Sequence, residues 1–451
     1  MHEKKLPPST QKTHWLFGNT MELKHDSLGS LLKWQKEFGS FYSFYRVNQP
    51  HYVATKPEYI KYVLQDNNKN YHKGKAFEYM KVLLGNGLVT NEGDFWRKQR
   101  RMAQPAFHKT KLAGLTEVMT GLIEEFLDEW EQKYQSGDRI NLTKEMNLLA
   151  LKIVSKALFQ SEVGEAIYKI GDHLNYALYR MMMRLRNPFL PPRWIPTAAN
   201  RKEQKAIREL FGIIDGIIAQ RRQDTQDYND LLSMLMHSED EDTGEKMSNQ
   251  QLRDEVMTLF MAGHESSSAA LGYLFWLLSQ YPDIDQKVEA ELAQNLGSAA
   301  FTFESMRQVP YSSQVINEML RLYPPAWTVG RKAVADDEID GYHVPAGTSI
   351  MIPAYVVHRD ADLWEQPHEF LPERWQTQQV KELPRFAYFP FGGGPRLCIG
   401  DQFALLEIHA VLALLKRRFT FEHQPRHHIA LQPLITMRPV EDIYLTLIRR
   451  G

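Results

Sequence analysis

The spacing of apolar residues predicts a mostly helical chain. Apolar side chains recur every three or four positions over much of residues 56–242, for example in residues 115–134 (LTEVMTGLIEEFLDEWEQKY), and this period is typical of amphipathic helices. Val, Ile and Tyr alternating beside turn residues predict short strands near residues 39–47, 51–56 and 341–352. The pattern therefore indicates a mainly α protein with a small β-rich region.

Two breaks interrupt the helical pattern. Residues 186–196 (RNPFLPPRWIP) contain four prolines, through which a helix cannot continue, so one helix should end near Leu185 and another should begin near Ala198. The second break is a charged loop at residues 237–248 (HSEDEDTGEKMS) that has no apolar period.

The longest predicted helix starts directly after this charged loop. Ser248 and Gln251 have the spacing of a capping box, and Pro282 should stop the helix near Gln280. At ~1.5 Å per residue such a helix is roughly 48 Å long. We expect it to form the spine of the fold.

Composition and charge narrow the class of protein. Hydrophobic residues make up 43% of the 451 residues and aromatic residues 11%, which is typical of a globular chain with a large core. The 54 basic and 55 acidic side chains give a net charge of -1, so no preference for nucleic acid or an anionic membrane is indicated. Length alone, at roughly 150 residues per domain, suggests about three domains.

The N-terminus and the cysteine content predict a location. The N-terminal segment lacks the apolar core of a signal peptide, and no window approaches the ~20 apolar residues of a membrane span. The single cysteine, Cys398, cannot form an internal disulfide and favours a reducing compartment. We therefore expect a soluble, cytoplasmic protein.

Cys398 lies in the segment FPFGGGPRLCIG, directly before an apolar helix pattern at residues 401–419. A lone cysteine is ordinarily a small buried hydrophobe. A helix N-terminus stabilises a thiolate by only ~0.3–1 kcal/mol, less than one pKa unit, whereas a bound metal deprotonates a thiol outright. The glycine run at residues 392–394 would let the backbone approach a large flat cofactor closely.

Two other roles for Cys398 are less well supported by its neighbours. Zinc is disfavoured because the chain has no second cysteine and because His427 and His428 are adjacent in sequence. A nucleophilic cysteine needs a partner histidine and oxyanion donors, and the sequence leaves that role open.

Two polar clusters occur within predicted helices. In residues 261–269 (MAGHESSSA) Gly263 and three serines weaken the helix beside Glu265. The glycine and the serines are either tolerated by the helix, or they mark a local distortion of the helix that opens space for a small ligand beside an acid and an alcohol.

Glu318 and Arg321 share one helix face. Taken without other information, they are expected to form an exposed ion pair that contributes ~0.2–0.5 kcal/mol to helix stability.

The segment FGGGPRLCIG resembles the haem-binding loop of the cytochrome P450 family, whose pattern is Phe-x-x-Gly-x-Arg-x-Cys-x-Gly. The residues at its fixed positions are Phe391, Gly394, Arg396, Cys398 and Gly400. Further segments that resemble motifs of this family are Trp96-x-x-x-Arg100, AGHES at residues 262–266, Glu318-x-x-Arg321 and LPERW at residues 371–375. The resemblance covers essentially the whole chain. It implies a single P450 domain over residues 1–451, mainly α and triangular in outline, with a small β-rich region.

The resemblance also implies a cofactor, haem b, with the Cys398 thiolate as its axial ligand and O2 as co-substrate. Phe391 would pack near the sulfur. The residues that would meet the haem propionates are Trp96, Arg100, Arg331 and Arg396.

Glu265 and Ser266 occupy the positions at which the family relays protons to iron-bound oxygen. Most members have Thr where this chain has Ser266, so the hydroxyl is kept and a methyl group is lost. By the same resemblance Glu318, Arg321 and Arg374 would form a buried ion cluster behind the haem, which replaces the exposed-pair interpretation.

The implied reaction inserts one oxygen atom into a bulky hydrophobic substrate such as a fatty acid, a terpenoid or a carotenoid. The residues expected to line its pocket are Phe77, Leu88, Met181, Met182, Ala262, Ala326, Trp327, Val329 and Ile435. For the methionines, plain core packing is the alternative. Arg180, Arg184 and Arg186 either anchor a substrate carboxylate or face water.

We expect no fused flavin or iron–sulfur domain after Cys398, so the electrons should come from an external ferredoxin or flavodoxin with its NAD(P)H reductase. Arg97, Lys98 and Arg101 form either a docking patch for such an acidic partner or an ordinary solvated face.

Two alternative functions are consistent with the cysteine loop. One is a haem-thiolate peroxygenase, isomerase or dehydratase, against which Glu265 and Ser266 argue. The other is a haem-based binding or sensor protein without oxygenase activity.

Overall fold

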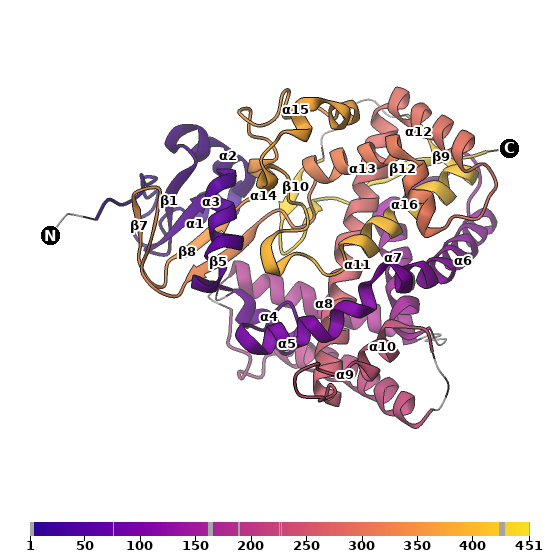
Figure 1. Cartoon of the computed structure of the whole chain (residues 1–451), viewed down its shortest axis with the longest axis horizontal. Helices are drawn as coiled ribbons and strands as arrows, with labels where there is room; N and C mark the ends of the chain where they lie inside the picture. The colour runs from indigo at the N-terminus through magenta and orange to yellow at the C-terminus, as the bar shows by residue number, and fades with distance from the viewer. Residues whose placement is uncertain are drawn as a thin grey trace. The chain divides into compact units, whose positions relative to one another are not determined.

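The computed structural model (Figure 1) describes residues 4–74, 76–160, 166–187, 190–224, 226, 228–423 and 429–450. The chain folds as two compact units. The first contains residues 4–74, 314–398 and 431–438, and the second contains the described residues of 76–313, 399–430 and 439–450. Among all described residues, no helix is both long and apolar enough to cross a membrane.

The first unit contains a five-stranded sheet with the strand order β1-β2-β8-β5-β3. Its strands are β1 (Phe41–Arg46), β2 (Gln49–Ala54), β3 (Tyr71–His72), β5 (Val329–Ala333) and β8 (Ser349–Ile352). β1 and β2 form a hairpin through Val47 and Asn48, both with positive φ, as a two-residue hairpin turn requires. β2 pairs with β8, so strands far apart in the sequence lie side by side (Figure 1).

Short helices and two strand pairs complete the first unit. The helices are α1 (Thr20–His25), α2 (Ser27–Phe38), α3 (Pro57–Lys61), most of α13 (Pro310–Leu322), α14 (Ala354–Val357) and α15 (Gln378–Lys381). The pairs are β6 (Asp337–Ile339) with β7 (Tyr342–Val344), and β10 (Leu431–Pro433) with β11 (Met437–Pro439). A buried cluster that includes Phe41, Ile60, Val344, Ile350 and Phe389 forms a core against the sheet.

The second unit is built around α11 (Asn249–Gln280), a helix of 32 residues. Its predicted start and end are confirmed. The Ser248 side chain accepts a bond from the Gln251 backbone, the Gln251 side chain accepts one from the Ser248 backbone, and Tyr281 and Pro282 follow the last turn. α7 (Leu142–Phe159) packs along α11 (Figure 1).

The remaining elements of the second unit are mostly helices. They are α4 (Ala76–Leu84), α5 (Gly93–Ala103), α6 (Lys109–Lys133), α8 (Ala166–Arg186), α9 (Ala198–Gln223), α10 (Leu231–His237), α12 (Pro282–Asn295) and α16 (Asp401–Arg418). A three-stranded sheet has the order β4 (Arg139–Asn141), β12 (Tyr444–Arg449), β9 (Phe419–Phe421). α8 ends and α9 begins on either side of the proline-rich segment, as the prolines predict.

Candidate functional site

Cys398 lies at the end of a loop that is closed by its own backbone. The backbone N–H of Cys398 donates to the carbonyl of Phe391 at 3.0 Å, and the N–H of Gly392 donates to the carbonyl of Phe389 at 2.9 Å. The Cys398 side chain is exposed, and α16 begins three residues later at Asp401. The loop therefore presents the only thiol of the chain just before a helix N-terminus.

Glycine is required in this loop for a steric reason. Gly394 has a φ of +66°, and a Cβ atom there would lie 1.9 Å from the carbonyl oxygen of Leu64. A Cβ atom on Gly393 would lie 2.2 Å from a ring carbon of Phe386. Gly392 also has a positive φ, +72°, but open space surrounds its Cα. The middle of the loop thus packs directly on neighbouring backbone and ring atoms.

Glu318, Arg321 and Arg374 form a fully desolvated ion cluster in the first unit. Glu318 and Arg321 are both 0% exposed and Arg374 is 8% exposed. Arg321 binds both carboxylate oxygens of Glu318, at 2.9 and 2.8 Å, and the Nε atom of Arg374 donates to Oε1 of Glu318 at 2.9 Å. Buried charges of this kind are stable only when they are paired.

The same carboxylate accepts two further bonds. The indole N–H of Trp375 donates to Oε2 of Glu318 at 3.0 Å, and the backbone N–H of Leu371 donates to Oε1 at 3.0 Å. Sequence reasoning did not assign Trp375 a role, although its place directly after Arg374 in LPERW was a usable signal.

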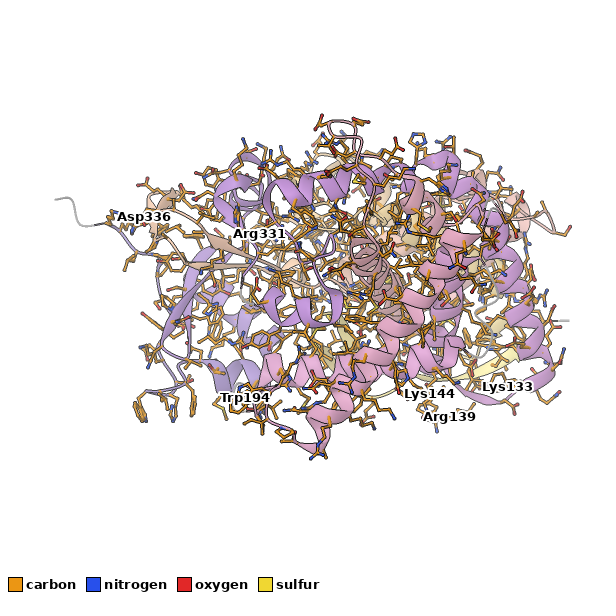
Figure 2. The ribbon with its side chains drawn as sticks, turned by 90° about the horizontal axis from the view of Figure 1, so that it is seen from below. Lys133, Arg139, Lys144, Trp194, Arg331 and Asp336 are labelled. Carbon is orange, nitrogen blue, oxygen red and sulfur yellow. The ribbon has the colours of Figure 1, made fainter. Side chains whose placement is uncertain are left out.

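Two of the arginines expected near the haem carboxylates lie in the first unit. Arg331 lies on β5 (Figure 2), is 7% exposed, and its Nη1 atom donates to the carbonyl of Gly330 at 2.9 Å. Arg396 is partly buried in the short helical turn of residues Gly394–Arg396, between the glycine run and Cys398.

Trp96 and Arg100 lie one turn apart on α5, in the second unit. Both line a pocket of about 650 Å³, together with Arg97, Arg101, Gln104, Pro105, His108, Thr110 and Lys111. The lining is rich in cations and suits carboxylate groups.

The three cations suggested as a docking patch are paired with acidic side chains. The pairs are Arg97 with Asp94, Lys98 with Glu245, and Arg101 with Asp240 and Asp242. The acids that bind Lys98 and Arg101 come from the charged loop before α11, so this loop offsets much of the positive charge of α5.

The acid and the alcohol of the AGHES segment lie in the middle of α11. Glu265 is 6% exposed, and the Ser266 hydroxyl donates to the carbonyl of Ala262 at 2.6 Å. Ala262 is exposed although most of the helix around it is buried. One face of α11 is therefore open at the turn that carries Ser266.

The helix is not broken at this point. α11 is continuous from Asn249 to Gln280, so the expected distortion does not interrupt it. A Cβ atom on Gly263 would lie 2.9 Å from a methyl group of Val154 on α7. The glycine therefore serves close packing of the two helices.

A buried acid that the sequence reasoning missed lies beside this segment. Glu407 of α16 accepts a 2.6 Å hydrogen bond from the Ser267 hydroxyl, and its other oxygen has no hydrogen-bond partner among the described residues. Burial raises the pKa of Glu407 to about 8, although the bond from Ser267 acts in the opposite direction. The only sequence signal was a single acid in the apolar run ALLEIHAVLALL.

The residues expected to line the substrate pocket differ in exposure. Leu88, Met181 and Trp327 are buried, Ala262 and Ala326 are exposed, and the partly buried ones are Phe77, Met182, Val329 and Ile435. Trp327 packs in a core cluster with Trp34, and its indole N–H donates to the carbonyl of Leu434 at 2.7 Å. This packing accounts for the burial of Trp327.

The structure corrects both sequence interpretations of Arg180 and Arg184 in α8, which were that they bind a substrate carboxylate or that they face water. Neither faces water, since they are 8% and 9% exposed, and the carboxylate that they bind is Glu203 of α9, at 3.4 and 3.0 Å. Arg193 of the connecting segment binds the same carboxylate at 2.7 Å. The side chain of Arg186 lies outside the described residues, as do His427 and His428.

The charge balance of this group sets the ionisation of its acid. Burial alone would raise the pKa of Glu203, but the three guanidinium groups outweigh burial and hold the pKa below its ordinary value. Trp194, next to Arg193 in the same segment, is 80% exposed (Figure 2).

The residues present suit a haem group on three counts. Cys398 offers an exposed thiol, and the thiolate form of such a group is a ligand of haem iron. Trp96 and Arg100 line a pocket whose cations suit carboxylates, and the exposed Ala262 leaves room at the centre of α11. The chemistry of these residues, considered within each unit, therefore suits an iron cofactor with acidic substituents.

Comparison with known proteins identifies the family. The sequence pattern of the family described as Cytochrome P450 matches residues 7–445 of the chain. The chain belongs to the cytochrome P450 family. The expected fold, mainly α with a small β-rich region, is thereby confirmed.

Several curated proteins are similar to this chain. Cyclooctat-9-en-7-ol 5-monooxygenase of Streptomyces melanosporofaciens is 34% identical over 83% of this chain and 81% of its own length. Cyclooctatin synthase of the same organism is 33% identical over 86% and 84%. The chloroplastic protein LUTEIN DEFICIENT 5 of Arabidopsis thaliana is 29% identical over 88% and 70%. The chain is a P450 monooxygenase, an oxidoreductase.

A solved structure agrees with this fold. Retinoic acid bound cyanobacterial CYP120A1 superposes with a TM-score of 0.86 at 24% identity, and the match covers 100% of both chains. This likeness shows that the two chains share the P450 fold.

Proposed function

We propose that this monooxygenase inserts one oxygen atom from O2 into a bulky hydrophobic substrate of the terpenoid or carotenoid class. The observation that carries the chemistry is the exposed Cys398 at the end of its hydrogen-bonded loop. The substrate class is supported by two relatives, one named for the oxygenation of cyclooctat-9-en-7-ol and one named for lutein.

Each residue has a defined task in this proposal. Cys398 would bind the haem iron as a thiolate, and Phe391 would limit access of water to the sulfur. The side chains proposed to bind the haem carboxylates are Trp96, Arg100, Arg331 and Arg396. When bound, the haem supplies the binding and activation of O2.

Glu265 and Ser266 are the proposed proton carriers. The Ser266 hydroxyl hydrogen, which is bonded to the Ala262 carbonyl in this structure, is the proton donated to the reacting oxygen. The Glu265 carboxyl group then returns a proton to Oγ of Ser266. A positioned acid and alcohol of this kind accelerate a proton transfer by about 10²–10⁴-fold.

An external ferredoxin or flavodoxin with its NAD(P)H reductase is the proposed source of electrons. Because Arg97, Lys98 and Arg101 are paired with acids, docking on α5 would require the partner to compete with those acids. Reversing the charge of Arg97 tests this site. Reduction rates and salt dependence that do not change would place docking elsewhere.

The deciding experiment is the absorption spectrum of the reduced protein with carbon monoxide. We expect the red-shifted Soret band of a thiolate-bound haem, and its absence in the purified haem protein would overturn the proposal. Terpenoid alcohols, carotenoids and fatty acids should then be screened for a spin-state change and for NAD(P)H consumption. A response to fatty acids alone would contradict the substrate class, turnover with peroxide alone would indicate a peroxygenase, and binding without turnover would indicate a sensor.

A further inference from the structure

His358, which directly follows α14, is a buried histidine without an assigned role. Its side chain is 0% exposed. The Nδ1 atom lies 3.2 Å from the backbone carbonyl oxygen of Arg321, and the Nε2 atom lies 3.0 Å from the backbone nitrogen of Phe389. The imidazole thus connects the end of α13 to the residue at which the Cys398 loop begins.

These two partners fix the protonation state of the ring. A backbone N–H can only donate, so Nε2 of His358 must accept the bond from Phe389 and carries no proton. A carbonyl oxygen can only accept, so Nδ1 carries the proton that is donated to Arg321. The ring is therefore neutral.

The surroundings of His358 agree with a neutral ring. Burial, together with the positive charges of Arg321 and Arg359, lowers the pKa of His358 to about 3, although the bond to the Arg321 backbone acts in the opposite direction. The other neighbouring rings, those of Tyr388 and Phe389, have centroids 5.3 and 5.2 Å away and carry no charge at neutral pH.

The connection to α13 is reciprocal. While Nδ1 of His358 donates to the backbone of Arg321, the Nη1 atom of Arg321 donates to the backbone carbonyl of His358 at 2.6 Å. Arg321 is the arginine that binds both oxygens of Glu318. His358 is thereby held by the ion cluster.

The other partner of His358, Phe389, is connected to Cys398 by backbone hydrogen bonds within the loop. The carbonyl of Phe389 accepts a bond from Gly392, and the carbonyl of Phe391 accepts a bond from Cys398. Backbone hydrogen bonds thus hold both ends of the loop from Phe389 to Cys398. The His358 side chain bonds to the first residue of this loop, Phe389.

We propose that His358 is a positioning residue for Cys398, whose neutral imidazole holds the start of the cysteine loop at a fixed place relative to α13. The ion cluster of Glu318, Arg321 and Arg374 then acts on the thiol through this ring. The role is useful to catalysis because a loop that shifts would move the sulfur away from the iron. The inference rests on the proposed haem ligation by Cys398.

Two variants separate this role from a general packing role. His358→Phe keeps a ring of similar size but leaves the Phe389 N–H and the Arg321 carbonyl without their partner. His358→Gln keeps an amide that can accept one bond and donate another. The matched control is His343→Phe, on β7 in the same unit, because this partly buried histidine contacts Lys4 and Asp336.

The first measurement uses the haem-loaded full chain. The readout is the fraction of the reduced carbon monoxide complex that has the red-shifted Soret band. We expect this fraction to fall several-fold in His358→Phe, to be largely restored in His358→Gln, and to equal wild type in His343→Phe. An equal fraction in His358→Phe and wild type would overturn the inference.

The second measurement uses the full chain purified without haem. Because Cys398 is the only cysteine, its rate of reaction with a maleimide reports on the loop alone. We expect a several-fold faster reaction in His358→Phe, and intermediate behaviour in His358→Gln. If His358→Phe does not fold, the maleimide rate of His358→Gln decides: a rate above that of the folded His343→Phe supports the inference, and a rate equal to it contradicts the inference.

The two measurements also separate this inference from the proposed function. If wild type has no red-shifted band, haem ligation by Cys398 fails whatever the maleimide rates are. If wild type has the band and both readouts are unchanged in His358→Phe, only the role of His358 fails.

Discussion

The Ser267 hydroxyl donates a 2.6 Å hydrogen bond to Oε2 of Glu407 and thereby joins α11 to α16. Because burial raises the pKa of Glu407 to about 8, the folded protein holds this proton at neutral pH. The unfolded chain, in which the carboxyl group titrates near its ordinary value of about 4.3, does not. Stability should therefore fall as the pH rises between about 5 and 8, by up to ~1.4 kcal/mol per pH unit.

The variant Glu407→Gln tests this proton. Gln cannot ionise, so the variant should gain stability relative to wild type as the pH rises over that interval. Urea unfolding of both proteins at several pH values measures the difference. The exposed Glu422 supplies the control Glu422→Gln, and a difference between Glu407→Gln and wild type that stays constant with pH would show that Glu407 is already ionised.

The variant Glu318→Gln removes the only carboxylate of the buried ion cluster. Arg321 and Arg374 would then be left desolvated without a counter-charge, which should cost about 3–5 kcal/mol of folding free energy and reduce haem content. Denaturant unfolding and the ratio of Soret to protein absorbance measure the two effects. Glu373→Gln, at an exposed position beside Arg374, should behave like wild type; similar losses in both variants would argue against a special cost at Glu318.

The variant Gly394→Ala tests the packing of the cysteine loop. A methyl group would lie 1.9 Å from the carbonyl oxygen of Leu64, so the loop must move and haem content should fall severely. Gly392→Ala has a similar positive φ but open space, and should cost only the ~1–2 kcal/mol of a left-handed alanine. Equal haem content in the two variants would mean that the contact with Leu64 is not important.

The variant Ser266→Ala tests the proposed proton carrier. Without the hydroxyl, more of the consumed electrons should leave as hydrogen peroxide, while Ser266→Thr should reduce this loss because its methyl group restricts the rotamer. The ratio of peroxide formed to NAD(P)H consumed measures the effect. Ser268→Ala removes a hydroxyl that bonds to the Glu265 carbonyl at 3.2 Å, and the assignment is wrong if Ser266→Ala and Ser268→Ala give the same ratio.

Features set by neighbouring residues could be predicted from the sequence. The capping box of Ser248 and the stop at Pro282 gave the bounds of α11, and the prolines of residues 186–196 gave the end of α8 and the start of α9. The cysteine loop was identified by its resemblance to the haem-binding loop of the family, whose pattern is contained in ten consecutive residues. Caps, prolines and turn glycines act over a few positions and can therefore be read directly.

Features set by partners far away in the sequence could not be predicted. An arginine on an amphipathic helix ordinarily faces water, and burial of Arg184 is favourable because Glu203 on the next helix supplies its counter-charge. The roles of Glu407 and His358 likewise depend on Ser267 and Phe389, which are 140 and 31 residues away. The sequence around each of these residues carries almost no sign of such contacts.

The carboxylate of Glu203 has a consequence for how α8 and α9 can move. Glu203 lies on α9, and its buried carboxylate binds Arg184 of α8 and Arg193 of the segment that connects the two helices. If α8 separated from α9, Arg180 and Arg184 would lose their counter-ion Glu203 inside the protein. A movement that admits a large substrate should therefore shift α8 and α9 together as one rigid pair.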